Sequence, residues 1–212
     1  EKGIRFIETK NHFEAQSTQD SVLTVSSVLK GVAISFSKIA NDIRLLGSGP
    51  RAGIGELEIP PVQPGSSIMP GKVNPVICES LIQICAQILG NDEAVSLGAQ
   101  GSYFELNLMM PMIASNILES INILSTGANT FNDKLLVSLK ANKKICNDYI
   151  EGSLAMCTSL VPVIGYDKAA EIAYKAYKEG KTIREIILRE GIISKEEVEK
   201  LLDHKNMIKS SK

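Results

Sequence analysis

Apolar residues in the first half of the chain recur at alternating intervals of three and four positions. Between Val22 and Leu46 this heptad register holds for more than three repeats, through Val22, Val25, Leu29, Val32, Phe36, Ile39, Ile43 and Leu46. The pattern predicts one helix of about 26 residues, ended by Gly47-Ser48-Gly49-Pro50. Because the flanking positions are small rather than charged, the spacing favours a helix of a bundle over a solvent-exposed coiled coil.

Two further long helices are predicted downstream. Asn74 and Pro75 suit an N-cap and a first helical position, and Ile77, Leu81, Ile84 and Ile88 follow at helical spacing. This second helix is expected to end near Gly90–Asp92. A third is expected from about Pro111 to about Leu139. Together these helices predict the wall of a helical bundle.

The pattern changes near Lys140, after which the predicted helices are short and carry explicit end signals. Thr182 with Glu185 and Ser194 with Glu197 form capping boxes, while Gly180 and Gly191 suit the positions just past helix ends. The sequence therefore predicts an all-α fold. Residues 1–140 are expected to form a long-helix bundle containing the loop 64–75, and residues 141–212 a small C-terminal helical domain.

Composition excludes several classes of protein. The 212 residues are 44% apolar and 22% charged, which supports a packed core and argues against disorder. With 23 basic and 24 acidic side chains, the net charge of -1 indicates neither nucleic acid nor an anionic membrane as a partner. No unbroken apolar run approaches the ~18 residues that would span a membrane.

Four cysteines, Cys78, Cys85, Cys146 and Cys157, lie within apolar helical patterns. None forms a C-x-x-C pair, and both histidines are distant in sequence. Reduced, buried thiols are therefore expected rather than disulfides or a zinc site.

Between the first two helices the chain becomes irregular. The segment "PGSSIMPGKVNP", Pro64 to Pro75, gathers Ser66, Ser67, Lys72 and Asn74 with no acidic residue among them. A phosphate-binding P-loop is excluded because five residues separate Gly65 from Gly71 and Val73 follows Lys72. A Ser-His-Asp site is disfavoured because the histidines lie near the two ends of the chain.

Two interpretations of this loop remain open. One is a rigid turn built from Pro and Gly. The other is a clamp for a carboxylate beside a serine base, in which Lys72 supplies charge, Asn74 supplies amide donors and the following helix start adds a favourable dipole. Such a clamp suits the removal of a proton next to a carboxylate, where charge develops in the transition state.

Short motifs in the sequence are more specific than these residue types. "GSSIMPGKVNP" closely resembles the signature loop of the fumarase/aspartase superfamily. The resemblance extends over nearly the whole chain and is closest to class II fumarate hydratases. It is carried by "HFEA" (12–15), "KIANDIRLLGSGPRAGIGEL" (38–57), "GND" (90–92), "FELN" (104–107) and "IGYDKAAEIA" (164–173).

The resemblance implies reversible hydration of fumarate to (S)-malate, a step of the tricarboxylic acid cycle, with neither metal nor organic cofactor. Ser66 matches the base that takes the C3 proton of malate. Ser67, Lys72 and Asn74 match positions that bind substrate carboxylate, and Val73 lies between them, where its backbone could contribute to binding. Glu79 matches a glutamate that pairs with a histidine to position water. An unperturbed serine is too weak a base, so Ser66 would need activation by positive charge and backbone N–H groups.

The resemblance further implies a homotetramer whose active sites draw segments from three subunits, in the cytoplasm or, in a eukaryote, the mitochondrial matrix. This chain matches only the second half of such an enzyme and lacks the histidine partner of Glu79, so it is expected to be incomplete alone, as a fragment or as one chain of a split enzyme. Two other functions stay open. "GPRAG" has the aspartase form, which leaves aspartate ammonia-lyase as an alternative, and a non-catalytic derivative of the fold is the other.

Overall fold

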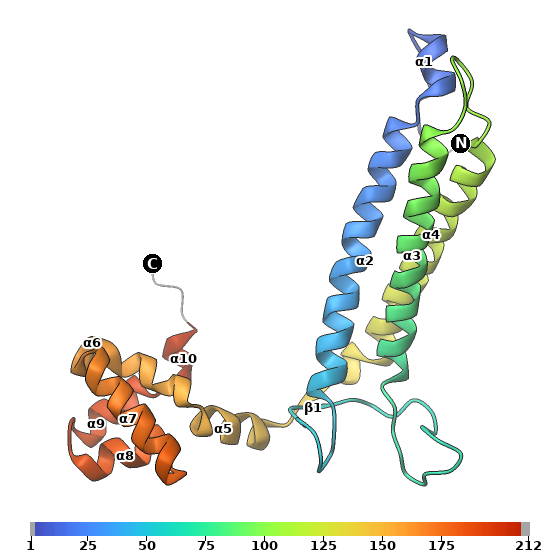
Figure 1. Cartoon of the computed structure of the whole chain (residues 1–212). Helices are drawn as coiled ribbons and strands as arrows, with labels where there is room; N and C mark the ends of the chain where they lie inside the picture. The colour runs from blue at the N-terminus through green and yellow to red at the C-terminus, as the bar shows by residue number, and fades with distance from the viewer. Residues whose placement is uncertain (1–2, 209–212) are drawn as a thin grey trace. The chain divides into compact units, whose positions relative to one another are not determined.

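The computed structural model describes residues 3–208 and is all-α, as predicted from the sequence. The chain divides into two compact units, Glu1–Lys140 and Ala141–Lys212, and each is described by itself. Long helices dominate the first unit, while the second is built from short ones (Figure 1).

The first long helix has the bounds that its heptad pattern predicted. After the short helix α1 (His12–Ser17), α2 runs from Asp20 to Leu46, and the backbone N–H of its C-cap Gly47 donates to the carbonyl of Ile43 at 2.9 Å. By length and mean hydropathy α2 could cross a membrane. The sequence did not predict this, because polar residues interrupt every apolar run. One face of α2 packs in the bundle through Ser26, Ala33 and Ala40, while other apolar positions along it are exposed.

The other long helices differ from their predictions at their ends. Helix α3 spans Val76–Gln100, so it continues through Gly90 instead of ending there. The reason is tertiary: Asn91 and Asp92 are buried and hydrogen-bonded to neighbouring helices, and these contacts outweigh the local preference for a turn. Its N-cap is Pro75 rather than Asn74.

Helix α4 spans Met110–Lys134 and therefore ends before the predicted Leu139. The chain continues as a 3-10 turn, η1 (Leu136–Ser138), and the short strands β1 (Leu57–Glu58) and β2 (Lys140–Ala141) pair with each other. Pro111 lies in the first turn of α4, where its missing N–H costs no hydrogen bond.

Helix α3 packs against both α2 and α4 in the first unit (Figure 1). The buried face of α2 consists of small residues, Ser26, Ala33 and Ala40, which allow the helices to approach closely. The apolar core between the helices is formed by Ala33, Ala40, Cys78, Leu81, Cys85, Ile88, Leu124, Phe131 and Leu135. Several heptad positions of α2 face away from this core, since Val25 is 46% and Ile39 45% exposed.

The second unit comprises α5 (Lys143–Gly152), the 3-10 helix η2 (Leu154–Leu160), α6 (Val161–Ile164), α7 (Tyr166–Glu179), α8 (Ile183–Glu190), α9 (Lys195–Leu201) and α10 (His204–Met207). Both predicted capping boxes are present, at Thr182 and Ser194. Gly180 and Gly191 adopt the left-handed conformation at helix ends, as predicted. Its core is formed by Met156, Leu160, Ile172, Ala176, Ile183, Ile186, Ile187, Val198 and Leu202.

An arginine on α8 links three helices of this unit. Arg184 makes a two-pronged ion pair with Glu151 of α5, with N–O distances of 2.9 and 2.8 Å, and a further bond of 2.8 Å to Glu199 of α9. The bonds from Arg184 hold the pKa of Glu151 below its usual value. The contact therefore ties α5, α8 and α9 together at the edge of the apolar core.

Candidate active site

The serine- and lysine-containing loop, residues 64–75 and called the signature loop from here on, directly precedes α3. It is closed at its neck by two hydrogen bonds. The Gly65 N–H donates to the carbonyl of Lys72 at 2.9 Å, and the Asn74 side-chain amide donates to the carbonyl of Gly65 at 2.6 Å. The segment between them thus forms a defined turn anchored to the helix start.

Glycine is required where the two sides of this neck meet. A Cβ atom on Gly65 would lie 2.3 Å from the Lys72 carbonyl oxygen and 2.9 Å from the Asn74 nitrogen, both backbone atoms. At the tip, Gly71 has a φ of +75°, which favours glycine. The Gly residues of this segment are therefore explained by backbone geometry, whatever the loop binds.

Ser66 lies inside the turn with its hydroxyl oxygen accepting two backbone hydrogen bonds. The N–H groups of Ile68 and Met69 both donate to it at 3.2 Å. Donors directed at an oxygen stabilise negative charge on it. The turn thus surrounds the Ser66 hydroxyl with backbone donors.

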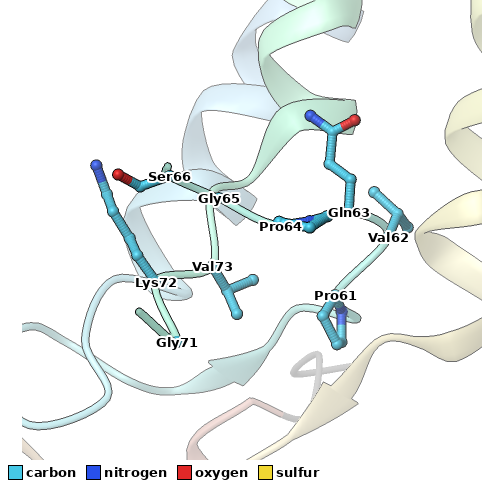
Figure 2. Close-up of a pocket in the computed structure, with 9 residues that line it drawn as sticks. All are labelled: Pro61, Val62, Gln63, Pro64, Gly65, Ser66, Gly71, Lys72 and Val73. Atoms are coloured by element: carbon cyan, nitrogen blue, oxygen red, sulfur yellow. The ribbon is translucent and has the colours of Figure 1, made fainter. Parts of the chain in front are cut away.

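Lys72 supplies positive charge at the same place. Ser66 and Lys72 line one open pocket of about 470 Å³, and Figure 2 shows the hydroxyl and the ammonium extending to the same side of the loop. Val73 also lines this pocket. The complete lining is Pro61, Val62, Gln63, Pro64, Gly65, Ser66, Gly71, Lys72 and Val73.

The remaining predicted site residues lie nearby but do not line the pocket. Ser67 is exposed on the turn, and Glu79 is partly buried in the first turn of α3. Asn74 is partly buried, and its amide nitrogen is engaged by the Gly65 carbonyl. This bond explains why Asn74 does not cap α3: its side chain points back across the neck.

A neighbouring thiol is chemically inactive here. Cys78 lies beside Glu79 on α3 and is fully buried. Burial raises the pKa of its thiol to about 11, against the opposing charge of Arg44. The thiol therefore stays protonated at neutral pH and offers no nucleophile to the pocket.

Several lining residues were missed in the sequence. The stretch 61–63 forms one wall of the pocket, and Gln63 is a polar side chain within it. The signal that could have found them is the density of prolines at 60, 61 and 64, which stiffens the chain just before the turn.

Two family models match parts of this chain, one in each unit. The model of a family described as "Lyase" matches residues 2–90, which include the signature loop. The model described as "Fumarase C C-terminus" matches residues 156–209, within the second unit.

Individual relatives match almost the whole chain. The fumarate hydratase class II of Methylorubrum extorquens is 46% identical over 99% of this chain and 44% of its own length. The mitochondrial fumarate hydratase of Dictyostelium discoideum is 46% identical over 99% of this chain and 43% of its own. A crystal structure of a fumarate lyase:delta crystallin from Brucella melitensis superposes with a TM-score of 0.91 at 42% identity, over 98% of this chain and 45% of that one.

The chain thus spans less than half the length of the relatives it matches. Sequence identity and fold similarity agree across both units, and the signature loop lies within the matched residues. The chain belongs to the fumarase/aspartase superfamily, in its class II fumarate hydratase family.

Proposed function

We propose that this chain supplies one segment of a composite active site that reversibly hydrates fumarate to (S)-malate in the tricarboxylic acid cycle. The observation that carries the proposal is the pairing of Ser66 and Lys72 at one pocket, with two backbone N–H groups directed at the Ser66 oxygen. Family membership supplies the reaction, because the relatives that match this chain are named fumarate hydratases.

In the direction of dehydration, the Ser66 oxygen takes a proton from C3 of malate. The electron pair of that C–H bond moves toward the adjacent carboxylate, whose developing charge Lys72 is placed to stabilise. The hydroxyl at C2 then takes a proton from the pair formed by Glu79 and a histidine of another segment and leaves as water, and the C2–C3 double bond of fumarate forms. In this mechanism Glu79 acts on that water together with a histidine from another segment, and Ser67, Val73 and Asn74 contribute to carboxylate binding.

We further propose that the working protein is a homotetramer with active sites shared between subunits. The support lies on α2, where the heptad positions Val25, Val32 and Ile39 are 38–46% exposed. An apolar stripe of this length is covered by other helices in a stable protein. The substrate is a small dicarboxylate, and the location is the cytoplasm or, in a eukaryote, the mitochondrial matrix.

The test is a chimera in which residues 1–212 replace the matching part of a complete class II fumarate hydratase. Loss of fumarate absorbance and formation of malate are expected, and Ser66→Ala should lower turnover by about a hundredfold or more. Ser27→Ala, an exposed hydroxyl on α2, is the matched control and should leave turnover unchanged. Ammonia-dependent formation of aspartate without malate would replace the proposal with an aspartate ammonia-lyase, and turnover unchanged by Ser66→Ala would refute the assigned base.

A further inference from the structure

Small residues recur at seven-residue intervals along the interface between α2 and α3, with the larger Leu29, Phe36 and Ile43 packed beside them. Ser26, Ala33 and Ala40 form the buried face of α2, and Cys78, Cys85 and Asp92 are buried on α3 at the same spacing. The helices are antiparallel, since Ser26 contacts Asp92 whereas Cys78 lies near Arg44. Counting by heptads from the Ser26–Asp92 contact pairs Ala33 with Cys85 and Ala40 with Cys78, and all four belong to one apolar cluster. Cys85 lies against the backbone of Ser37, one helical turn from Ala33.

The polar members of this interface form a tight network. The Ser26 hydroxyl donates to Asp92 Oδ1 at 2.6 Å, and the Lys30 ammonium donates to Asp92 Oδ2 at 2.9 Å. The Asp92 side chain is 5% exposed, whereas that of Lys30 is 45% exposed. Burial opposes ionisation of Asp92, but the bonds from Ser26 and Lys30 outweigh it and hold its pKa below the usual value.

The apolar part of the interface does not distinguish one alignment from another. If α2 moved by one heptad along α3, Ala would again face Cys, because both seams repeat small apolar residues at the same interval. The connection through residues 47–75 is long, so chain closure alone does not impose an alignment, although Ile59 within it packs against the bundle. Asp92, however, would lose both partners, and a buried carboxylate without partners is strongly unfavourable.

The interface between α3 and α4 has other restraints. A Cβ on Gly127 would lie 2.8 Å from Ile84 Cδ1, and one on Gly98 would lie 2.8 Å from Ile113 Cγ1, so large residues fit against glycines in one alignment. The short connection 101–109 is also tied down, because the Asn107 amide donates to the Gly98 carbonyl at 3.1 Å. Steric matches of this kind restrain the alignment of α3 against α4.

We infer that the contact of Asp92 with Ser26 and Lys30 sets the axial alignment of α2 against α3. The inference does not rest on the proposed function. Its consequence reaches the signature loop, because α2 and α3 hold the two ends of the segment 47–75. A slip of one heptad would displace one end against the other by about 10 Å.

The native thiols allow a direct test in the full chain. In A33C, mild oxidation followed by peptide mass spectrometry identifies which cysteine pairs with the thiol introduced at position 33. With the polar contact intact, that partner is expected to be Cys85. When Ser26→Ala and Asp92→Leu are added, pairing with Cys78 is expected to appear and the share of the Cys85 product to fall, because the two alignments become similar in energy.

The matched control is Ser120→Ala in the A33C background. Ser120 accepts a bond from Asn91 at 3.1 Å between α3 and α4, so its loss should leave Cys85 as the sole partner. If Cys85 also remains the sole partner without Ser26 and Asp92, the alignment is set elsewhere and the inference is wrong. Should the Ser26/Asp92 variant lose its helical circular dichroism, Asp92→Asn, which preserves side-chain size, decides between the same two outcomes.

Discussion

Asn74 offers a sharp test of how the signature loop is held closed. The resemblance assigns this residue to carboxylate binding, whereas the structure shows its amide donating to the Gly65 carbonyl at 2.6 Å. Asn74→Ala removes that bond and leaves the neck with the Gly65–Lys72 backbone bond of 2.9 Å. A hydrogen bond of this kind contributes about 0.5–1.5 kcal/mol net, so the open population of the loop should rise about two- to tenfold.

Hydrogen exchange measures this opening directly. The Gly65 N–H is protected by the Lys72 carbonyl, and its exchange in Asn74→Ala should accelerate by the same two- to tenfold factor. The melting temperature should change little, because the loop lies outside the apolar cluster of the bundle. Asn41→Ala is the matched control: it removes an amide bond of 2.9 Å to the Ser37 carbonyl within α2 and should leave Gly65 exchange unaltered.

Unchanged exchange at Gly65 in Asn74→Ala would refute the assignment of Asn74 as the closing residue. A fall in substrate affinity of the chimera without any change in Gly65 exchange would instead support direct binding of substrate by Asn74.

Three further predictions follow from particular side chains. Lys72→Met should weaken substrate binding by the chimera by about thirtyfold or more, measured as KM, while leaving the melting temperature unchanged because Lys72 is exposed. Thr182→Ala should destabilise the second unit by about 1 kcal/mol in urea unfolding, because it removes the capping box of α8. Thr24→Ala, which removes an exposed hydroxyl from α2, should have little effect. The pKa of Asp92 is lowered in the folded protein. Its contribution to stability is therefore complete above its unfolded pKa of about 3.9 and is lost as the pH falls through the folded pKa. Asp92→Asn should flatten this acid dependence of the unfolding free energy.

The sequence predicted helices best where one apolar period continued without interruption. The bounds of α2 and both capping boxes in the second unit were predictable, because heptad spacing and end signals are local properties. The end of α3 was not, since Gly90–Asp92 resembles a turn in isolation. Only the neighbouring helices supply the partners that keep Asn91 and Asp92 helical, and sequence spacing does not reveal partners 29 and 66 residues away.

The candidate site, too, was predictable from the sequence only in part. Residue types identified Ser66 and Lys72, which the structure brings to one pocket. The fold of the loop around them could not be predicted, because a Pro- and Gly-rich segment has no period from which to derive contacts. The bond from Asn74 to Gly65 spans nine residues of irregular chain, and residues 61–63, which precede it, form another wall of the same pocket.

The position of the loop then depends on residues far from it. A loop that receives an anion must present polar groups and water-accessible backbone, so it cannot also carry an apolar core of its own. Ser66 and Lys72 are therefore only as well placed as the helix ends that hold the segment 47–75. Because the seam of Ala and Cys between those helices is sterically permissive, a buried carboxylate on α3 has to supply the specificity that packing lacks. The ionised Asp92 thus adds stability as well as fixing one alignment, and through the ends of α2 and α3 that alignment sets where the segment 47–75 begins and ends.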